Sequence, residues 1–324
     1  MVKFGYLASL CIVTGLLVQG CGGSGVSLPV VTVFTSTLGG VSISSNSGST
    51  FVNKTILDGL GSNTVRGITI SGTTLYAATD GGVSISTNGG LTWVNKTTAN
   101  GLGNNLVFQI AVSSGKVYAA TFGGLSVSAD SGATWSNKTT ANGLGSNACR
   151  SVAASGATVY AGTDGGFSIS SDSGASYTNK TTANGLGNNR INGIAFSGAT
   201  IYAATNGGGL AFSIDSGASW NNKTTADGLG SNTVEGVAMS GTNVYVGTDG
   251  GLSVSNNAGG SWANRTIADG LGDNVAIRIN INGSRIYVAT NTGLSISTNG
   301  ANTFTNKTTT SGLGSNSVSD VVSQ

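Results

Sequence analysis

The sequence predicts an all-β fold, a seven-bladed β-propeller of four-stranded antiparallel blades in which the C-terminal strand closes the N-terminal blade. Three observations support this prediction: a regular internal repeat, four strand patterns within each copy, and complementary fragments at the two ends of the chain. The tripeptide Gly-Leu-Gly recurs with a period of 42 or 43 residues, beginning at Gly59, Gly101, Gly143, Gly185, Gly228, Gly270 and Gly312. Periods of about 40–45 residues with several short strands are typical of propeller blades.

Each copy contains four short segments in which apolar and small polar residues alternate, as in half-buried strands. In one copy they cover 65–70, 75–79, 83–86 and 93–97, with Gly and Asn at every junction. The second residue of the second segment is aromatic throughout, at Phe34, Tyr76, Tyr118, Tyr160, Tyr202, Tyr245 and Tyr287. No helical periodicity is found after residue 21.

The two ends of the chain carry different parts of one copy. The first copy begins at the second strand, 33–37, and the last ends after the first strand, 318–322. We therefore expect 318–322 to pair with 33–37, which closes the ring and removes exposed sheet edges. An open β-solenoid is the alternative, but it has no need of complementary fragments.

Composition excludes several function classes. Charged residues make up 8% of the chain, against about 25% in an average soluble protein. The net charge is only +2, which argues against a nucleic-acid partner, because such proteins present a basic face. There is no histidine, which removes histidine acid–base catalysis and histidine metal ligands. We expect no metal and no other cofactor.

The N-terminus predicts export. Residues 1–20 read as a signal peptide, with Lys3 before an apolar run over 4–18 that is shorter than the about 20 residues needed to span a membrane. The segment ends in Val-Gln-Gly-Cys at Cys21, which resembles the bacterial lipobox. This resemblance implies cleavage before Cys21, acylation of that cysteine and attachment to a membrane.

The predicted domain organisation follows from this reading. Residues 21–29 form a flexible tether with the lipidated Cys21, and residues 30–324 form the propeller. No aspartate follows Cys21, so we expect an outer-membrane or cell-surface lipoprotein. An ordinary secretory signal with a chance cysteine is the alternative. Cys149 is then the one cysteine left in the propeller; the other copies have small apolar residues there, which indicates a core residue.

The segment between the third and fourth strands carries a motif. Residues 128–135 read Ser-Ala-Asp-Ser-Gly-Ala-Thr-Trp, and 213–220 are similar, while Ala301 replaces the glycine in the last copy. This motif resembles the Asp-box, or BNR repeat. The Gly-Leu-Gly segment with the first two strands also resembles two-component-regulator propeller repeats, and the whole chain resembles the photosystem II stability/assembly factor family. The Asp-box resemblance implies that these acids build a turn and are not catalytic.

When the seven copies are aligned, two sets of equivalent positions, which we call columns, vary most. One lies at the start of the first strand, at Arg66, Phe108, Arg150, Asn192, Glu235, Ile277 and Ser319, and its neighbouring column includes Gln109, Arg278 and Asp320. The other lies between the second and third strands, at Leu38, Asp80, Phe122, Asp164, Asn206, Asp249 and Asn291. In an up-and-down blade both columns reach the same end of the central channel, where propeller ligands commonly bind. The alternative is neutral drift of solvated loops.

From these columns we predict a ligand-binding face made of Arg66, Phe108, Phe122, Arg150, Asp164, Glu235 and Asp249. We expect Arg66 to pair with Asp80 and Arg150 with Asp164, and the two phenylalanines to offer a stacking platform. Glu235 and Asp249 are expected to form an acidic sector.

The predicted function is that of a monomeric, surface-anchored, non-catalytic binding or scaffold protein for a protein or carbohydrate ligand, attached to the membrane through Cys21. One alternative is a glycoside hydrolase or sialidase-like enzyme, because Asp-box propellers include such enzymes. Another is a membrane-complex assembly factor, whose family carries an arginine-rich patch. The six arginines here are expected to be scattered around the ring, which fits that alternative poorly.

Overall fold

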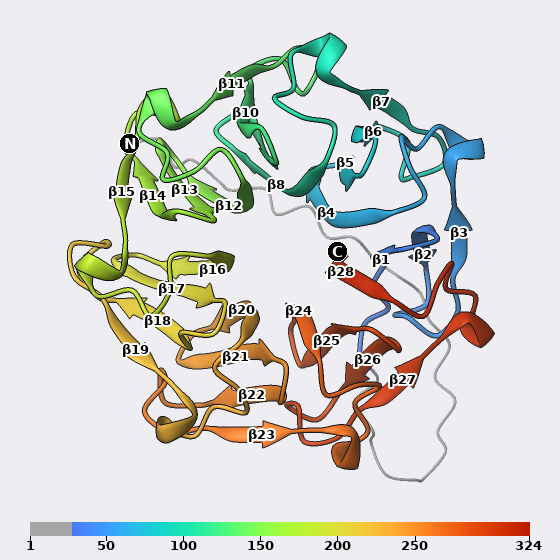
Figure 1. The fold of residues 1–324 in the computed structure, drawn as a ribbon. Helices are drawn as coiled ribbons and strands as arrows, with labels where there is room; N and C mark the ends of the chain where they lie inside the picture. The colour runs from blue at the N-terminus through green and yellow to red at the C-terminus, as the bar shows by residue number, and fades with distance from the viewer. Residues whose placement is uncertain (1–27) are drawn as a thin grey trace, which may run out of the picture.

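The computed structural model describes residues 28–324. The predicted signal peptide, Cys21 and the tether up to residue 27 therefore lie outside the described residues. The described chain forms seven four-stranded antiparallel sheets, arranged as blades in a ring (Figure 1). The predicted seven-bladed β-propeller is confirmed. In the part of the chain that the structure describes, no helix has the length and apolar character to cross a membrane.

Blades 1 to 6 follow chain order, and blade 7 combines the two ends of the chain. The innermost strands, in blade order, are β4 (Val65–Ser71), β8 (Val107–Ser113), β12 (Cys149–Ser155), β16 (Ile191–Ser197), β20 (Val234–Ser240), β24 (Ala276–Asn282) and β28 (Val318–Ser323). The second strands are β5 (Thr74–Thr79), β9 (Lys116–Thr121), β13 (Thr158–Thr163), β17 (Thr200–Thr205), β21 (Asn243–Thr248), β25 (Arg285–Thr290) and β1 (Val33–Thr37).

The third and fourth strands complete each blade. The third strands are β6 (Gly82–Ser86), β10 (Gly124–Ser128), β14 (Gly166–Ser170), β18 (Leu210–Ser213), β22 (Gly251–Ser255), β26 (Gly293–Ser297) and β2 (Gly40–Ser44). The fourth strands, which form the outer rim in Figure 1, are β7 (Val94–Lys96), β11 (Ser136–Lys138), β15 (Thr178–Lys180), β19 (Asn221–Lys223), β23 (Ala263–Arg265), β27 (Thr305–Lys307) and β3 (Val52–Lys54).

A single-turn 3₁₀ helix follows every fourth strand, a feature that the sequence analysis did not predict. These turns are η1 (Ile56–Asp58), η2 (Thr98–Asn100), η3 (Thr140–Asn142), η4 (Thr182–Asn184), η5 (Thr225–Asp227), η6 (Ile267–Asp269) and η7 (Thr309–Ser311). In η2 the Thr97 side chain accepts from Ala99, Asn100 accepts from the Thr97 N–H, and Gly101 ends the turn at φ 96°. One turn is too short for helical periodicity, but the Thr-x-x-Asn/Asp-Gly spacing is a capping signature.

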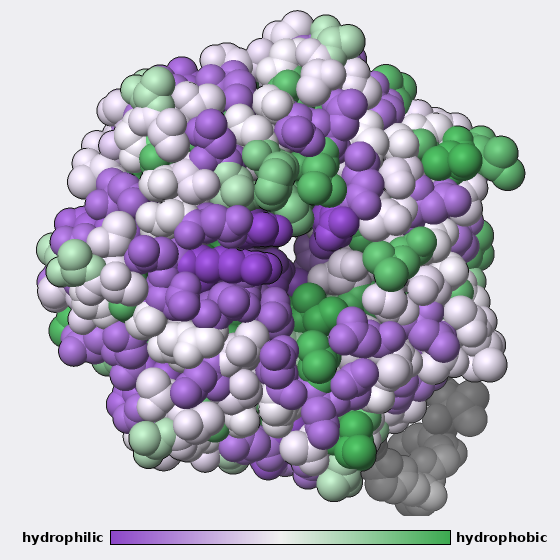
Figure 2. Space-filling view, in the orientation of Figure 1, coloured by the Kyte–Doolittle hydropathy of each residue, from purple (hydrophilic) through white to green (hydrophobic). Residues whose placement is uncertain are grey.

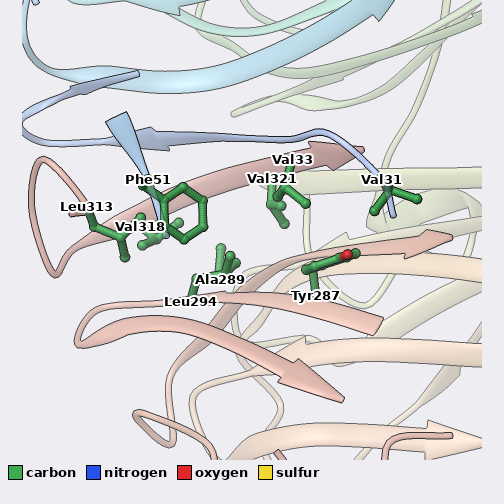
Figure 3. Close-up of a cluster of buried hydrophobic side chains, with 9 residues drawn as sticks. All are labelled: Val31, Val33, Phe51, Tyr287, Ala289, Leu294, Leu313, Val318 and Val321. Carbon is green, nitrogen blue, oxygen red and sulfur yellow. The ribbon is translucent and has the colours of Figure 1, made fainter. Parts of the chain in front are cut away.

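The closing strand pairs as predicted. Strand β28 lies antiparallel to β1, with Phe34 opposite Val322 and Thr35 opposite Val321. Figure 3 shows Val33 and Phe51 from one end of the chain packed with Val318 and Val321 from the other, in one buried cluster. The two ends of the chain thus share a sheet and a core, which is the physical basis of ring closure.

The turn between the third and fourth strands, which we call the outer turn, is built by its repeated serine and acid. In blade 2, Ser128 Oγ donates to Asp130 Oδ1 (2.7 Å) and accepts from the Gly132 N–H (2.8 Å). Asp130 Oδ1 also accepts from the Thr134 N–H at 2.9 Å. Hydrogen bonds from Thr134, then from Ser128, lower the pKa of Asp130. These acids are therefore occupied by their own turns.

Cys149 lies in the core, as predicted. It is fully buried beside Leu125 and Val152. Burial raises the pKa of the Cys149 thiol to about 12, so the thiolate that a nucleophile requires is not formed at neutral pH.

Candidate binding site at the channel mouth

The starts of the innermost strands meet the turns between the second and third strands at one end of the central channel. We call this end the channel mouth. It holds a cavity of about 260 Å³, and Figure 2 shows the hollow at the centre of the disc, with hydrophilic residues over β12 and β16 and hydrophobic ones over β8. The lining residues are Arg66, Phe108, Arg150, Arg190, Asn192, Glu235, Ile277, Arg278, Asn291, Ser317 and Ser319.

A layered cluster of arginine and phenylalanine side chains forms one side of the mouth. Two guanidinium groups contact the ring of Phe108, with Arg66 Cζ 5.3 Å and Arg150 Cζ 4.8 Å from its centroid. Arg150 Cζ is also 5.7 Å from the centroid of Phe122, so this arginine links the two rings. Such cation–π contacts favour stacked faces.

Carboxylates of the same blades hold these arginines in place, as the sequence predicted. Arg150 donates through Nε and Nη2 to the two carboxylate oxygens of Asp164, both at 2.9 Å. Arg66 makes the same bidentate pair with Asp80, where Nη2 donates to Oδ2 at 3.1 Å. A bidentate pair fixes the plane of the guanidinium group, so both arginine faces are preset against Phe108.

Arg190 belongs to the mouth, although the sequence analysis did not select it. Its Nε lies 3.8 Å from Asp164 Oδ1 and its side chain is 44% exposed. The other copies carry Thr, Leu, Ala, Val or Ser at this position, and that departure was the signal that could have identified it. Four of the six arginines therefore line one cavity, and the expectation that they are scattered around the ring was wrong.

Arg278, which also lines the cavity, connects three consecutive blades. Its Nη2 donates to the carbonyl of Asn192 at 2.8 Å, and its Nη1 donates to the carbonyls of Glu235 and Ile277. Each innermost strand has one edge without a neighbouring strand, so its backbone groups face the channel. Arg278 satisfies carbonyls from blades 4, 5 and 6 and holds that side of the mouth together.

Two other residues of the same column bridge neighbouring blades. Gln109 accepts from the Val152 N–H at 3.0 Å, and Asp320 accepts from the Ile68 N–H at 3.1 Å. Burial raises the pKa of Asp320 to about 6, against the opposing attraction of Arg278. This variable column thus supports the channel wall.

Of the seven predicted site residues, four line the cavity and three do not: Phe122, Asp164 and Asp249. Glu235 of the predicted acidic sector lines it, and Asp249 is close enough for its charge to act on Glu235. Burial raises the pKa of Glu235, the charge of Arg278 opposes that rise, and the charge of Asp249 adds to it. Asp249 stays exposed at the surface, and its pKa is raised by desolvation. Among residues 28–324, neither carboxylate has a cationic side chain within 4.0 Å. This sector is therefore open to a hydrogen-bond donor from a ligand.

The arrangement is suited to binding. The aromatic column of the second strands is buried between blades, as in Tyr118 and Tyr287, so it supplies no nucleophile to the cavity. Asp80 and Asp164 are occupied by arginines. Within the described range 28–324, no three Cys, Asp or Glu side chains come together to hold a metal ion. What the mouth offers is stacked flat faces, guanidinium donors and one carboxylate pair.

Solved structures share this fold. The extracellular domain of BT3049 from B. thetaiotaomicron, described as a hybrid two component system, matches with a TM-score of 0.63 at 17% identity over 75% of this chain and 35% of its own. YCF48 from Cyanidioschyzon merolae matches with a TM-score of 0.57 at 13% identity, over 78% of this chain and 87% of its own. An ancestral GH74 enzyme matches with a TM-score of 0.57 at 18% identity, over 80% of this chain and 38% of its own.

The matches differ in how much they cover. This chain spans 35% of the length of the BT3049 structure. No curated protein matches its sequence. Residues 121–229 match the model of the DUF6242 beta propeller domain. The chain is therefore a β-propeller whose residues 121–229 match the DUF6242 beta propeller domain, and it shares its fold with an extracellular domain from B. thetaiotaomicron, with YCF48 and with a GH74 enzyme.

Proposed function

We propose that this protein is an exported, non-catalytic binding module that receives a protein segment or a carbohydrate at the channel mouth and is held at a membrane through Cys21. Two features support export: the apolar run over 4–18, which is followed by Cys21, and structural relatives that are extracellular domains. A structure of YCF48 is bound to D1 peptide, which supports a protein segment as one ligand class.

The layered cluster at the mouth is the observation that carries the proposal. The copies of the repeat are close to identical, yet only at this end do they differ together in charge and aromaticity. Phe122 is 48% exposed and rests on Arg150, which is itself fixed by Asp164. A flat sugar face or a planar side chain can stack on such a surface without reorganising it, while Arg190 and Glu235 offer polar contacts.

Glycan and peptide arrays would identify the ligand, and one double variant tests the site. Phe108→Ala with Phe122→Ala should weaken binding by about 30-fold, since aromatic anchors contribute about 2 kcal/mol or more. The matched control is Ile214→Ala, which removes an exposed apolar side chain from an outer turn and should leave affinity unchanged. Undiminished affinity in the double variant would place the ligand elsewhere.

A glycoside hydrolase is the second candidate, because a GH74 enzyme shares the fold and the pKa of Glu235 is raised, as in a general acid. Hydrolysis of oligosaccharides that is abolished in Glu235→Gln, with ligand binding retained, would establish this alternative and overturn the non-catalytic proposal.

A further inference from the structure

Large apolar side chains gather on the outer rim where blade 7 meets blade 1. We call this set the rim patch; its members are 55% to 93% exposed, and they are Val52, Ile56, Leu57, Leu91 and Val94. Leu57, at the tip of η1, is the most exposed. Such a concentration on a weakly charged surface requires an explanation.

Comparison of the copies shows that the rim patch is local. The fourth strand begins with valine only in β3 and β7, and elsewhere with Ser, Thr, Asn or Ala. The first two residues of η2, η3, η4 and η5 are Thr-Ala, whereas η1 has Ile56-Leu57. Leu91 stands where the other copies have Ser, Ala, Gly or Asn. On the outer turns and 3₁₀ turns of the other described blades, exposed large apolar residues occur singly, as Ile214 in blade 4 and Ile267 in blade 5, so apolar replacements concentrate in two adjacent blades.

The fold makes these residues one surface. The Trp93 N–H donates to the Asp58 carbonyl at 2.9 Å, which places η1 of blade 7 against the start of β7 in blade 1. The outer turn that carries Leu91 packs on blade 7. Gly90 of this turn lies so close to Ile43 of β2 that a Cβ on Gly90 would be 2.6 Å from Ile43 Cδ1. In Figure 2 a hydrophobic area covers the rim at the position of η1.

We propose that the rim patch inserts into the interfacial region of a lipid bilayer, so that the propeller stands on this rim. This inference rests on the proposed membrane attachment through Cys21. Leu57 projects from a convex single turn, a shape that suits penetration between headgroups. Lys96 ends β7 beside the patch and is half-buried, so its stem can lie on apolar surface while its ammonium group reaches the headgroups. The ammonium group of Lys54 instead donates to Asp58 Oδ1 at 3.1 Å.

The position of the chain start supports the bilayer as occupant. Arg285 donates to the carbonyls of Leu28 and Pro29, and Val31 lies in the blade 7 core. From Cys21 to Leu28 the chain can span at most about 25 Å. An acyl group on Cys21 therefore keeps blade 7, which carries three of the five rim-patch residues, close to the bilayer. In this orientation the channel mouth opens sideways and stays accessible.

Vesicle flotation of residues 28–324 tests the patch without the anchor, since this segment contains every strand of the seven blades. The probe is vesicles of phosphatidylethanolamine and phosphatidylglycerol at high salt. Ile56→Thr with Leu57→Ala should lower the bound fraction at least about tenfold, and the fold should tolerate it because four other copies have Thr-Ala there. The matched control is Ile267→Thr, the same change on another blade, which should not alter flotation.

The other outcomes are decisive. A segment that does not float, or floats equally well with both substitutions, overturns the inference. A stable dimer that the double variant dissociates would assign the rim patch to a second copy of the chain and also overturn it. The anchor is tested separately by the mass of Cys21 in the native protein. Absent acylation would refute the anchor, while flotation would still decide on the patch.

Discussion

The outer turns and the channel mouth use acidic side chains in opposite ways. In the outer turns, hydrogen bonds from the turn itself lower the pKa of Asp130 and bring that of Asp215 to about 2. At the mouth and in the channel, burial raises the pKa of Glu235 and brings that of Asp320 to about 6. The repeat thus stabilises the outer-turn carboxylates, whereas burial penalises Glu235 and Asp320; Asp80 and Asp164 at the mouth are paired with arginines.

This difference distinguishes acidic residues that stabilise the fold from acidic residues that the fold holds at a cost in stability. An outer-turn acid gains from folding because the native state supplies it with N–H and O–H donors. A channel acid loses hydration on folding and recovers only part of it from Arg278 or from a backbone N–H. Charged groups retained under such a penalty are frequent at functional sites, and for Glu235 this agrees with the ligand site that we propose from the layered cluster at the mouth.

Ring closure depends on the ends of the chain, and its removal should have the largest effect. Deleting residues 318–324 removes β28, leaves β1 without its inner neighbour and takes Val318 and Val321 from the closing cluster. We expect a loss of more than about 5 kcal/mol, because a buried strand and its sheet pairing are lost together. Thermal unfolding followed by circular dichroism checks this. An unchanged melting temperature would show that closure contributes nothing.

Packing between outer turns and the preceding blade should give the next largest effect. A Cβ at Gly132, where φ is 91°, would lie 2.5 Å from Ile85 Cδ1. The corresponding residue of the last copy is Ala301, which is buried and packs with the smaller Val254. Gly132→Ala should therefore cost about 2–4 kcal/mol through overpacking and the left-handed backbone.

The compensating change sharpens this prediction. Ile85→Val in the Gly132→Ala background reproduces the Val254–Ala301 pairing and should recover about half of the lost stability, as measured by denaturant unfolding. If Ile85→Val gives no recovery, packing against the preceding blade does not explain why glycine recurs there.

The sequence was sufficient for the blades and insufficient for the mouth, for a physical reason. Strand order and closure follow from alternation within short segments and from the fragments 33–37 and 318–322, which are local properties. The course of Arg278 is not local, since its partner carbonyl at Asn192 is 86 residues away. Arg190 was missed because its contact with Asp164 depends on how adjacent blades are placed. The 3₁₀ turns are also encoded locally. Their signal is the spacing of the capping Thr, Asn or Asp, and Gly, and not a helical periodicity.

Asp320 should make stability depend on pH in the sense opposite to Asp215. The pKa of Asp320 is about 6 in the folded state, against 3.8 for an aspartate exposed to water. Folding therefore favours the protonated form. Stability should fall as pH rises from about 4 through 6 and then level off. Asp320→Asn should be more stable than the native protein by about 1–2 kcal/mol at pH 8, because Asp320 keeps part of its solvent exposure, and equal to it near pH 4.

Asp215→Asn provides the matched comparison. Its folded pKa of about 2 lies below 3.8, so its contribution is present above pH 4 and is lost as pH falls towards 2. Urea unfolding at a series of pH values measures both variants. Parallel pH profiles for the two substitutions would contradict the contrast between outer turns and channel.

The smallest expected effect is that of the ion pairs at the mouth. The side chains of Arg66 and Asp80 are 37% and 34% exposed, and those of Arg150 and Asp164 are 21% and 33% exposed. Pairs with this much contact with solvent contribute about 0–1 kcal/mol, and salt screens them. A double-mutant cycle on Arg66→Ala and Asp80→Ala should give a coupling of about 0.5 kcal/mol that decreases with salt.

The cycle on Arg150→Ala and Asp164→Ala should give slightly more, since Arg150 is less exposed and contacts both Phe108 and Phe122. A coupling above about 2 kcal/mol in either cycle would mean that the pairs hold the ring together, and the mouth would then belong with the outer turns as a folding element.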